Sequence, residues 1–206
     1  MGHHLETSAG TTSGRMTLRN PRNTALPIET RVAERIVTES GETRYEPADA
    51  DFLVFPPQFI VPPRSAQTIQ FRYLGPALQD RSRAYVLFVT EAPVINPELG
   101  VGIQMIYELG AAVYLYPPGA TADLRFEGAN PLPDGRVEVL VRNQGGRHAV
   151  LGVEGLLSVP GARGALASYG EAMTRDYGNP IIPPYSVRRF VVDPSPAPAV
   201  SPPGGL

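Results

Sequence analysis

The sequence contains no cysteine, no lysine and no long apolar run. All 18 basic residues among its 206 residues are arginine. The absence of cysteine excludes disulfides, thiolate chemistry and zinc-finger ligation, although it does not decide the compartment. No apolar stretch approaches the roughly 20 residues that span a bilayer, so we expect no transmembrane helix. A net charge of −2 gives no basic footprint, which argues against nucleic acid as a partner.

Residue patterns typical of enzymes are also missing. No GxSxG, HExxH, P-loop or EF-hand motif occurs. His148 is the only histidine outside the first four residues, and we expect it to be exposed in the turn-like stretch QGGRHA. Asp49 and Asp51 stand two residues apart before an apolar run, a spacing that is common in solvated turns. We therefore expect no catalytic residue, no metal site and no cofactor.

Period-2 alternation of apolar residues, with turn residues in between, predicts an all-β protein of the sandwich type. The residues from 74 to 83, LGPALQDRSR, could hold a single helical turn. We expect residues 1–14 to be a disordered or tag-like start, with His3 and His4 as a possible tag remnant, and the Pro-rich residues 194–206 to be disordered. The expected strands are Met16–Asn20, Pro27–Ile36, Phe52–Val61, Gln67–Tyr73, Ala84–Glu91, Val101–Tyr116, Ala122–Gly128, Arg136–Asn143, Ala149–Ser158 and Ser186–Asp193.

The stretch FLVFPPQFIVPP, residues 52–63, places two Pro-Pro pairs inside an apolar run. Proline lacks the N–H that a central strand needs, so it is confined to sheet edges, strand starts and bulges. We therefore expect this segment to run along the border of a sandwich and to cross one of its corners.

Two pairs of segments indicate an internal repeat. Asn20 and Asn143 each follow an arginine at the end of an apolar run and are 123 residues apart. Ile60 and Ile181 each begin a pair of apolar residues that directly precedes Pro-Pro, and they are 121 residues apart. The nearly equal offsets favour two similar domains that meet near residues 116–118, the alternative being chance matches between Pro-rich strand ends.

The longest alternating run is VGIQMIYELGAAVYLY, residues 101–116. Its odd positions form a continuous apolar face, and 16 extended residues would reach about 53 Å, far beyond an ordinary strand. We expect it to cross from one domain toward the next or to carry a bulge, for example at Gly110. It is either the last core strand of the first domain or an exposed edge that pairs with a partner strand and inserts alternate side chains into that partner.

Several stretches, in order, resemble the PapD-like family of periplasmic pilus-assembly chaperones. They are LRNPRNTALPIETRV from Leu18, FLVFPPQFIVPPRSAQTIQFRY from Phe52, DRSRAYVLFVTEAPV from Asp80, and the long strand that ends in VYLYPP. The likeness is clear from about Arg15 to Tyr116 and weaker to about Asp193. DADFLVFPPQ is most similar to the branch that assembles archaic, spore-coat-U-type fimbriae.

The resemblance implies two immunoglobulin-like β-sandwich domains in an L-shaped arrangement, over residues 15–117 and 118–193. It implies a periplasmic, non-enzymatic chaperone that donates residues 101–116 to pilus subunits and delivers them to an outer-membrane usher. We expect no signal peptide within this sequence. A homodimer in which two chains cap each other is a further expected partner state. The alternative is a tandem immunoglobulin-like adhesion module. The expected subunit-binding side chains are Ile103, Met105, Tyr107 and Leu109, in a register that could differ by one residue.

The family's carboxylate anchor has no direct match here. Its lysine on the long strand corresponds to Val113, and the family's first strand, which carries its arginine, is not recognisable in residues 1–14. Either the first strand of domain one is missing from this chain or this branch of the family uses other donors. We consider Arg15, Arg72 and Arg83 as donors for a bidentate carboxylate clamp, against the alternative that each is a solvated surface arginine.

Overall fold

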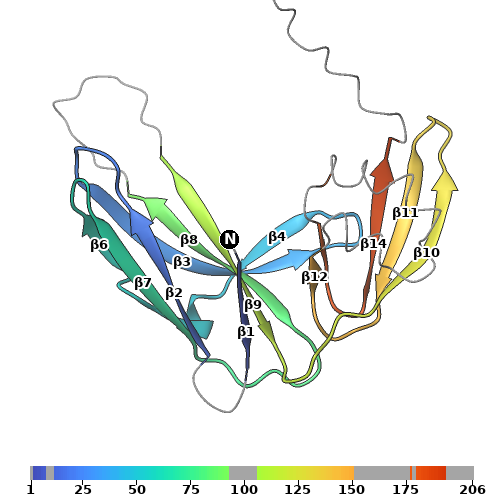
Figure 1. Ribbon diagram of the computed structural model, residues 1–206, viewed down its shortest axis with the longest axis horizontal. Coiled ribbons are helices and arrows are strands. Elements are labelled where there is room, and N and C mark those ends of the chain that lie inside the picture. The colour runs from blue at the N-terminus through green and yellow to red at the C-terminus, as the bar shows by residue number, and fades with distance from the viewer. Residues whose placement is uncertain (1, 8–11, 93–105, 151–176, 178–179, 194–206) are drawn as a thin grey trace, which may run out of the picture. The chain divides into compact units, whose positions relative to one another are not determined.

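The computed structural model describes residues 2–7, 12–92, 106–150, 177 and 180–193. The chain divides into two compact units (Figure 1). Among the described residues, no helix is long and apolar enough to cross a membrane. The expected all-β class is confirmed, and the L-shaped arrangement of the domains stays a prediction. Unit 1 comprises Met1–Val37, Thr43–Thr121 and Gly146–His148, and unit 2 comprises Thr38–Glu42, Ala122–Gly145 and Ala149–Leu206.

Unit 1 is built from two sheets. In the first sheet the strand order is β1 (Gly2–Glu6), β9 (Glu108–Tyr116), β8 (Arg83–Glu91), β3 (Leu26–Val37) and β4 (Thr43–Pro47), with β6 (Gln58–Val61) also paired to β3. The second sheet has the order β2 (Ser13–Arg19), β7 (Ala66–Tyr73) and β5 (Phe52–Phe55). Only the pairing of β1 with β9 is parallel among those described in these sheets.

The core of unit 1 lies between the two sheets. Six consecutive residues of β8, from Ala84 to Val89, are buried, because this strand lies inside the first sheet and is covered on both faces. On the outer face, Arg31 lies 3.8 Å from the ring centroid of Phe88 and covers it. The buried core side chains are Leu18, Leu26, Ile28, Val32, Ala48, Phe52, Val61, Ile69, Phe71, Tyr73, Tyr85, Leu87, Val89, Val113 and Leu115.

The Pro-rich stretch crosses from one sheet to the other, as the sequence predicts. β5 pairs with β7 at the border of the second sheet, and β6 pairs with β3 in the first sheet. Pro56 and Pro57 lie between the two short strands, and the bond from Phe55 to Pro56 is cis. The prolines therefore stand where the chain leaves one ladder and joins the other, and neither has to donate an N–H to a ladder.

Unit 2 contains a three-stranded sheet and a strand pair. β10 (Leu124–Pro131), β11 (Val137–Asn143) and β14 (Ser186–Val192) are adjacent in this order, and β12 (Ala149–Val150) pairs with β13 (Ile181–Ile182). The alternation of β11 is strict, with Val137, Val139 and Val141 buried and the residues between them half-buried. Phe190 and Ile182 complete a core in which both side chains are fully buried.

The internal repeat is reproduced in the strand pairing. Arg19 of β2 is the partner of Ala66 in β7, and Arg142 of β11 is the partner of Val187 in β14. These two pairs are related by the same offsets that the sequence shows. Arg64 and Tyr185, each directly after Pro-Pro, both have a left-handed backbone, with φ of 56° and 53°. Such agreement at equivalent positions favours duplication over chance.

A buried asparagine performs the same task in both units. Asn20 Nδ2 donates to the carbonyl oxygens of Thr24, Val61 and Pro62 at 2.8, 3.0 and 3.1 Å. In unit 2, Asn143 Nδ2 donates to the Ile182 and Pro183 carbonyls at 3.3 and 3.1 Å. Each asparagine thus satisfies carbonyl groups of the Pro-Pro segment that would otherwise be buried without a donor.

Several local predictions are wrong. The described residues of the first 14 include β1 and the start of β2, so a first strand is present where the sequence analysis expects a disordered start. The polar strand β4 was not anticipated, and no helical turn forms between residues 74 and 83. The β8–β9 register is continuous through Gly110, without a bulge.

His148 and the pair Asp49 and Asp51, which the sequence suggests are solvated turn residues, make defined contacts instead. His148 is half-buried, with Nδ1 2.5 Å from Ser82 Oγ. Asp49 and Asp51 form a 3-10 turn; an Asp49 carboxylate oxygen accepts the Val32 N–H at 2.7 Å. Both groups therefore stabilise the fold of unit 1. The Pro-rich tail, residues 194–206, lies outside the described residues.

Candidate functional site: an open strand edge

β9 is paired along almost its whole length on one side and along only part of it on the other. On one side, residues 108–115 pair antiparallel with residues 83–90 of β8. On the other side, β1 pairs only with residues 112–116 (Figure 1). Within the part of the chain that the structure describes, the edge of residues 108–111 therefore has no neighbouring strand. Main-chain N–H and C=O groups on such an edge are available for another strand.

Side chains at odd positions of β9 change from buried to exposed along the strand. Val113 and Leu115 are 1% and 0% exposed and belong to the core, and Ala111 packs against this core. Leu109 and Tyr107, on the same face, are 56% and 53% exposed. The apolar face predicted from the sequence is therefore continuous over the described residues, but only its C-terminal half is covered by unit 1 itself.

The exposed half of this face borders a hollow of about 200 Å³. Core side chains from both sheets reach its wall, including Leu18 of β2 and Val89 of β8. Apolar groups predominate, with a charged rim supplied by arginine and glutamate. The complete lining is Leu18, Arg19, Pro21, Arg22, Leu26, Ile28, Val89, Glu91, Tyr107 and Leu109.

An ion pair next to Tyr107 holds the beginning of the open segment in place. Arg22 donates to both carboxylate oxygens of Glu91, at 2.6 and 3.0 Å, and its guanidinium carbon lies 5.4 Å from the ring centroid of Tyr107. The hydrogen bond to Glu91 raises the pKa of the Arg22 guanidinium. The Glu91 N–H also donates to the Tyr107 carbonyl at 2.9 Å. Tyr107 is thus fixed through both backbone and side chain, although it lies outside the strand.

Glu108 is fixed in a similar way on the opposite face. Its carboxylate accepts a hydrogen bond from Thr90 Oγ1 at 2.9 Å and one from Arg31 Nη2 at 3.1 Å. The open edge is therefore preorganised before any partner binds, which lowers the entropic cost of association.

The structure describes two of the four predicted subunit-binding residues. Tyr107 and Leu109 lie at the open end of β9, on the expected face. Ile103 and Met105 lie outside the described residues, as does the N-terminal part of the predicted long strand.

The three candidate anchoring arginines are not brought together. Arg83 on β8 donates to both carboxylate oxygens of Glu34, at 2.9 and 2.5 Å, and lies 3.5 Å from Asp51. The Glu34 hydrogen bonds raise the pKa of Arg83 above its usual range. Arg15 and Arg72 lie in the second sheet and line one common pocket. Of the three candidates, Arg15 and Arg72 are exposed and make no ion pair among the described residues, so these two remain open to an external carboxylate.

Val113 and β1 occupy the positions where the family's anchor is expected. The Val113 side chain is in the core, and its Cα partner on β1 is His3, whose ring meets Phe71 edge-on at 5.2 Å between centroids. β1 has the sequence GHHLE and contains no arginine. Sequence reasoning missed this strand because two histidines and a glutamate around one leucine show no apolar alternation.

Comparisons with known proteins agree on the fold. The chain is similar to a chain of the CsuC–CsuE chaperone–tip adhesion subunit pre-assembly complex of Acinetobacter baumannii, with 12% identity and a TM-score of 0.63, covering 93% of this chain and 87% of that one. The Salmonella enterica SafA pilin–SafB chaperone complex has 14% identity and a TM-score of 0.59, covering 94% of this chain and 81% of that one. The E. coli chaperone DraB has 16% identity and a TM-score of 0.56, covering 96% of this chain and 82% of that one.

The first of these structures comes from an archaic chaperone–usher system, which is the branch that the sequence favours. No curated protein matches the chain. A family model for pili and flagellar-assembly chaperones, the PapD N-terminal domain, matches residues 2–120, which is more than half of the chain. The protein therefore belongs to the PapD-like family of pilus-assembly chaperones, as the order of its sequence motifs indicates.

Proposed function

We propose that this chaperone binds pilus subunits in the periplasm by pairing the open edge of β9 with a subunit that lacks a strand of its own. The observation that carries the proposal is that the edge of residues 108–111, which is unpaired within the described part of the chain, coincides with exposed apolar side chains on one face. Main-chain hydrogen bonds would supply affinity, and alternate side chains would supply specificity.

The expected partner surface follows from the geometry of β9. Side chains two residues apart on a strand are separated by about 6.6–6.8 Å. A subunit that accepts Tyr107 and Leu109, and beyond them Met105 and Ile103, needs an apolar groove with pockets at this spacing. Burying each of these side chains contributes roughly 1.5–3 kcal/mol before association costs are subtracted. The four side chains together contribute about 6–12 kcal/mol before these costs, and main-chain hydrogen bonds to the open edge add to this.

Delivery to an outer-membrane usher completes the proposed role. This step is supported by family membership rather than by a described contact. An unoccupied edge of this kind favours pairing with another edge, so a homodimer joined through β9 is the proposed resting state at high concentration. The alternative role as an adhesion module is not favoured, because the matching family consists of assembly chaperones.

We do not place the three arginines considered for the carboxylate clamp, Arg15, Arg72 and Arg83, in the strand-donation site at β9. Arg83 already pairs with Glu34, and releasing it would leave a partly buried carboxylate without its partner. Arg15 and Arg72 have no such partner among the described residues, but they belong to a different sheet from β9.

Co-expression with the cognate subunit tests the strand-donation proposal. Ile103→Asp and Tyr107→Asp should each reduce the yield of soluble complex strongly, because a carboxylate would enter an apolar groove of the subunit. Ile60→Asp is the matched control, since Ile60 is 65% exposed on β6, away from the edge. Strand donation is wrong if both edge variants give the same complex yield as Ile60→Asp.

A further inference from the structure

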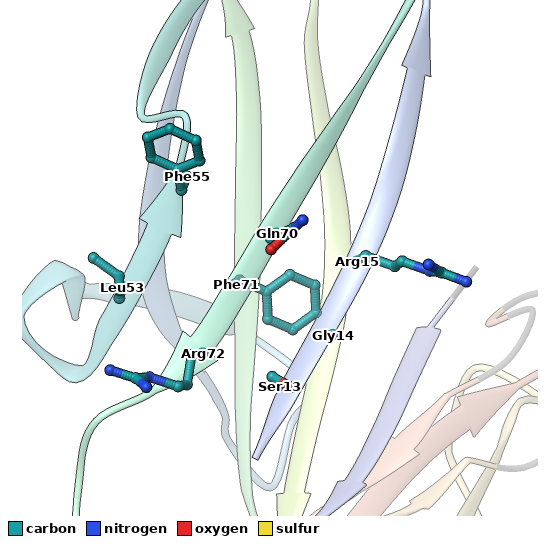
Figure 2. A pocket seen from close by; sticks show the side chains of 8 residues that line it. All are labelled: Ser13, Gly14, Arg15, Leu53, Phe55, Gln70, Phe71 and Arg72. Atoms are coloured by element: carbon teal, nitrogen blue, oxygen red, sulfur yellow. The ribbon is translucent and has the colours of Figure 1, made fainter. Parts of the chain in front are cut away.

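The exposed face of the second sheet carries an ordered grid of side chains across three strands. Arg72 of β7 is the Cα partner of Ser13 in β2 and of Leu53 in β5. In the next row, Gln70 is the partner of Arg15 and of Phe55. Partners across neighbouring strands point to the same face, so all six side chains share one surface (Figure 2).

This surface is hollowed into a pocket of about 670 Å³, a size typical of ligand sites. The ring of Phe71 lies beneath Gly14 and forms the floor of the pocket. A Cβ added at Gly14 would stand 2.3 Å from Phe71 Cζ, so glycine is required for the ring to occupy this position. The floor is therefore apolar and rigid, whereas the rim is polar.

The two arginines of the pocket are exposed and carry uncompensated charge. Among the described residues, neither Arg15 nor Arg72 makes an ion pair, in contrast to Arg22, Arg31 and Arg83, each of which has a glutamate partner. Figure 2 shows that the guanidinium groups extend toward opposite sides of the pocket. An acidic ligand that spans the pocket could therefore meet one arginine at each end.

The β5 side of the pocket is apolar and open to solvent. Leu53 is 52% exposed, and Phe55 is 67% exposed. Exposed side chains of this size next to unpaired arginines resemble the aromatic and arginine composition of interaction surfaces.

We propose that this pocket binds an acidic peptide segment of a partner protein, in which an apolar side chain is flanked by carboxylates. The apolar residue would lie against Leu53 and Phe55, and the carboxylates would accept charge-assisted hydrogen bonds from Arg72 and Arg15. Neighbouring strands are about 4.8 Å apart, so an extended segment that crosses three strands brings residues two apart over successive parts of the grid.

The pocket is separate from the strand-donation site. It lies on the outer face of the second sheet, and β9 belongs to the first sheet. A segment bound here therefore leaves the edge of residues 108–111 accessible, so a second partner could be recognised while a subunit is held.

Fluorescence anisotropy with the full chain tests the proposal directly. The probe is a labelled ten-residue peptide with Asp-x-Phe-x-Asp in a Ser/Gly background, compared with peptides in which both Asp are Asn or Phe is Ser. We expect the Asp/Phe peptide to bind more weakly as salt rises, and the double variant R15Q/R72Q to lose about tenfold or more in affinity. R44Q, on exposed β4, is the matched control and should bind like the wild type.

Three results would overturn the proposal. The first is equal binding of the Asp and Asn peptides, or no binding of any peptide at millimolar concentration. The second is unchanged affinity in R15Q/R72Q, with thermal unfolding confirming that the variant is folded. The third is a change of oligomeric state in this variant during gel filtration, which would identify a second copy of the chain as the occupant.

The same double variant separates this proposal from strand donation. Subunit co-purification should be unchanged in R15Q/R72Q, since the pocket and β9 lie on different sheets. Loss of the subunit would instead mean that the pocket holds a carboxylate of the subunit itself, and the proposal of a separate partner segment would be wrong.

Discussion

The two halves of β9 have the same alternating chemistry and opposite surroundings. At the C-terminal half, Val113 and Leu115 are buried between the sheets and β1 covers the strand edge. At the other half, Tyr107 and Leu109 continue the apolar face into solvent, and the edge is open within the described residues. One strand therefore serves as core at one end and as a binding surface at the other.

The difference shows that alternation alone does not decide whether a strand is structural or functional. What decides it is how far the neighbouring strands extend. β1 ends its pairing at Ala112, whereas β8 continues to pair as far as Glu108. The exposed half is held in place by β8 and by the Glu108 and Arg22 ion pairs, so it remains extended without a partner of its own.

The largest expected effect is at the buried end. Leu115→Ala should lower the free energy of unfolding by about 2–5 kcal/mol, because it leaves a cavity at a fully buried position. Leu109→Ala, the matched change at the exposed end, should cost less than about 0.5 kcal/mol. Urea denaturation of both variants measures the difference, and similar losses would contradict the division of β9 into two halves.

A second prediction concerns the asparagine that joins β2 to the Pro-Pro segment. Asn20→Ala should lower the free energy of unfolding by about 1–3 kcal/mol, since buried carbonyl groups lose their donor. Asn143→Ala in unit 2 is the matched variant and should have an effect of the same order. An Asn20→Ala protein as stable as the wild type would show that the shared motif of the two units is not structural.

A smaller effect is expected at alkaline pH in the covered half. Tyr85 is the Cα partner of Val113, and its hydroxyl donates to Asp51 at 3.1 Å. Burial raises the pKa of Tyr85 above its usual range. The folded state therefore keeps this proton while the unfolded chain loses it near pH 10, so the stability from this group is present below about pH 10 and falls as pH rises.

Tyr85→Phe tests this assignment. The variant should be less stable than the wild type at pH 8, because it loses a hydrogen bond, and its stability should fall less steeply between pH 9 and 11 than that of the wild type. Denaturation curves at several pH values give both slopes. Equal slopes would place the alkaline sensitivity at other groups, of which Tyr114, with a pKa also raised by burial, is the first candidate.

Much of the scaffold could be predicted because its signals are local. Pro56 and Pro57 could not serve inside a ladder, and they do mark a change of sheet. The alternation of residues 108–116 indicated the correct face of β9, and the repeat around Asn20 and Asn143 predicted equivalent strand pairs. In each case a residue type excludes most backbone environments, so that sequence alone restricts the structure.

Features that depend on pairing between distant segments could not be predicted. β1 is a strand because β9 offers it an edge, and nothing in GHHLE indicates this. The common pocket of Arg15 and Arg72 depends on the β2–β7 register, in which Ser13 is opposite Arg72. A shift of one residue would place either side chain on the other face. The pairing of Arg83 with Glu34 likewise follows only from the alignment of β3 with β8.

Amide hydrogen exchange of β9, measured in the free chaperone and in its complex with the cognate subunit, tests the central claim most directly. We predict that exchange over residues 106–111 slows markedly in the complex, because a subunit strand pairs with the open edge. Residues 112–116 should be protected in both states by β1 and β8. A stable complex in which exchange over residues 106–111 is unchanged would contradict strand donation by β9.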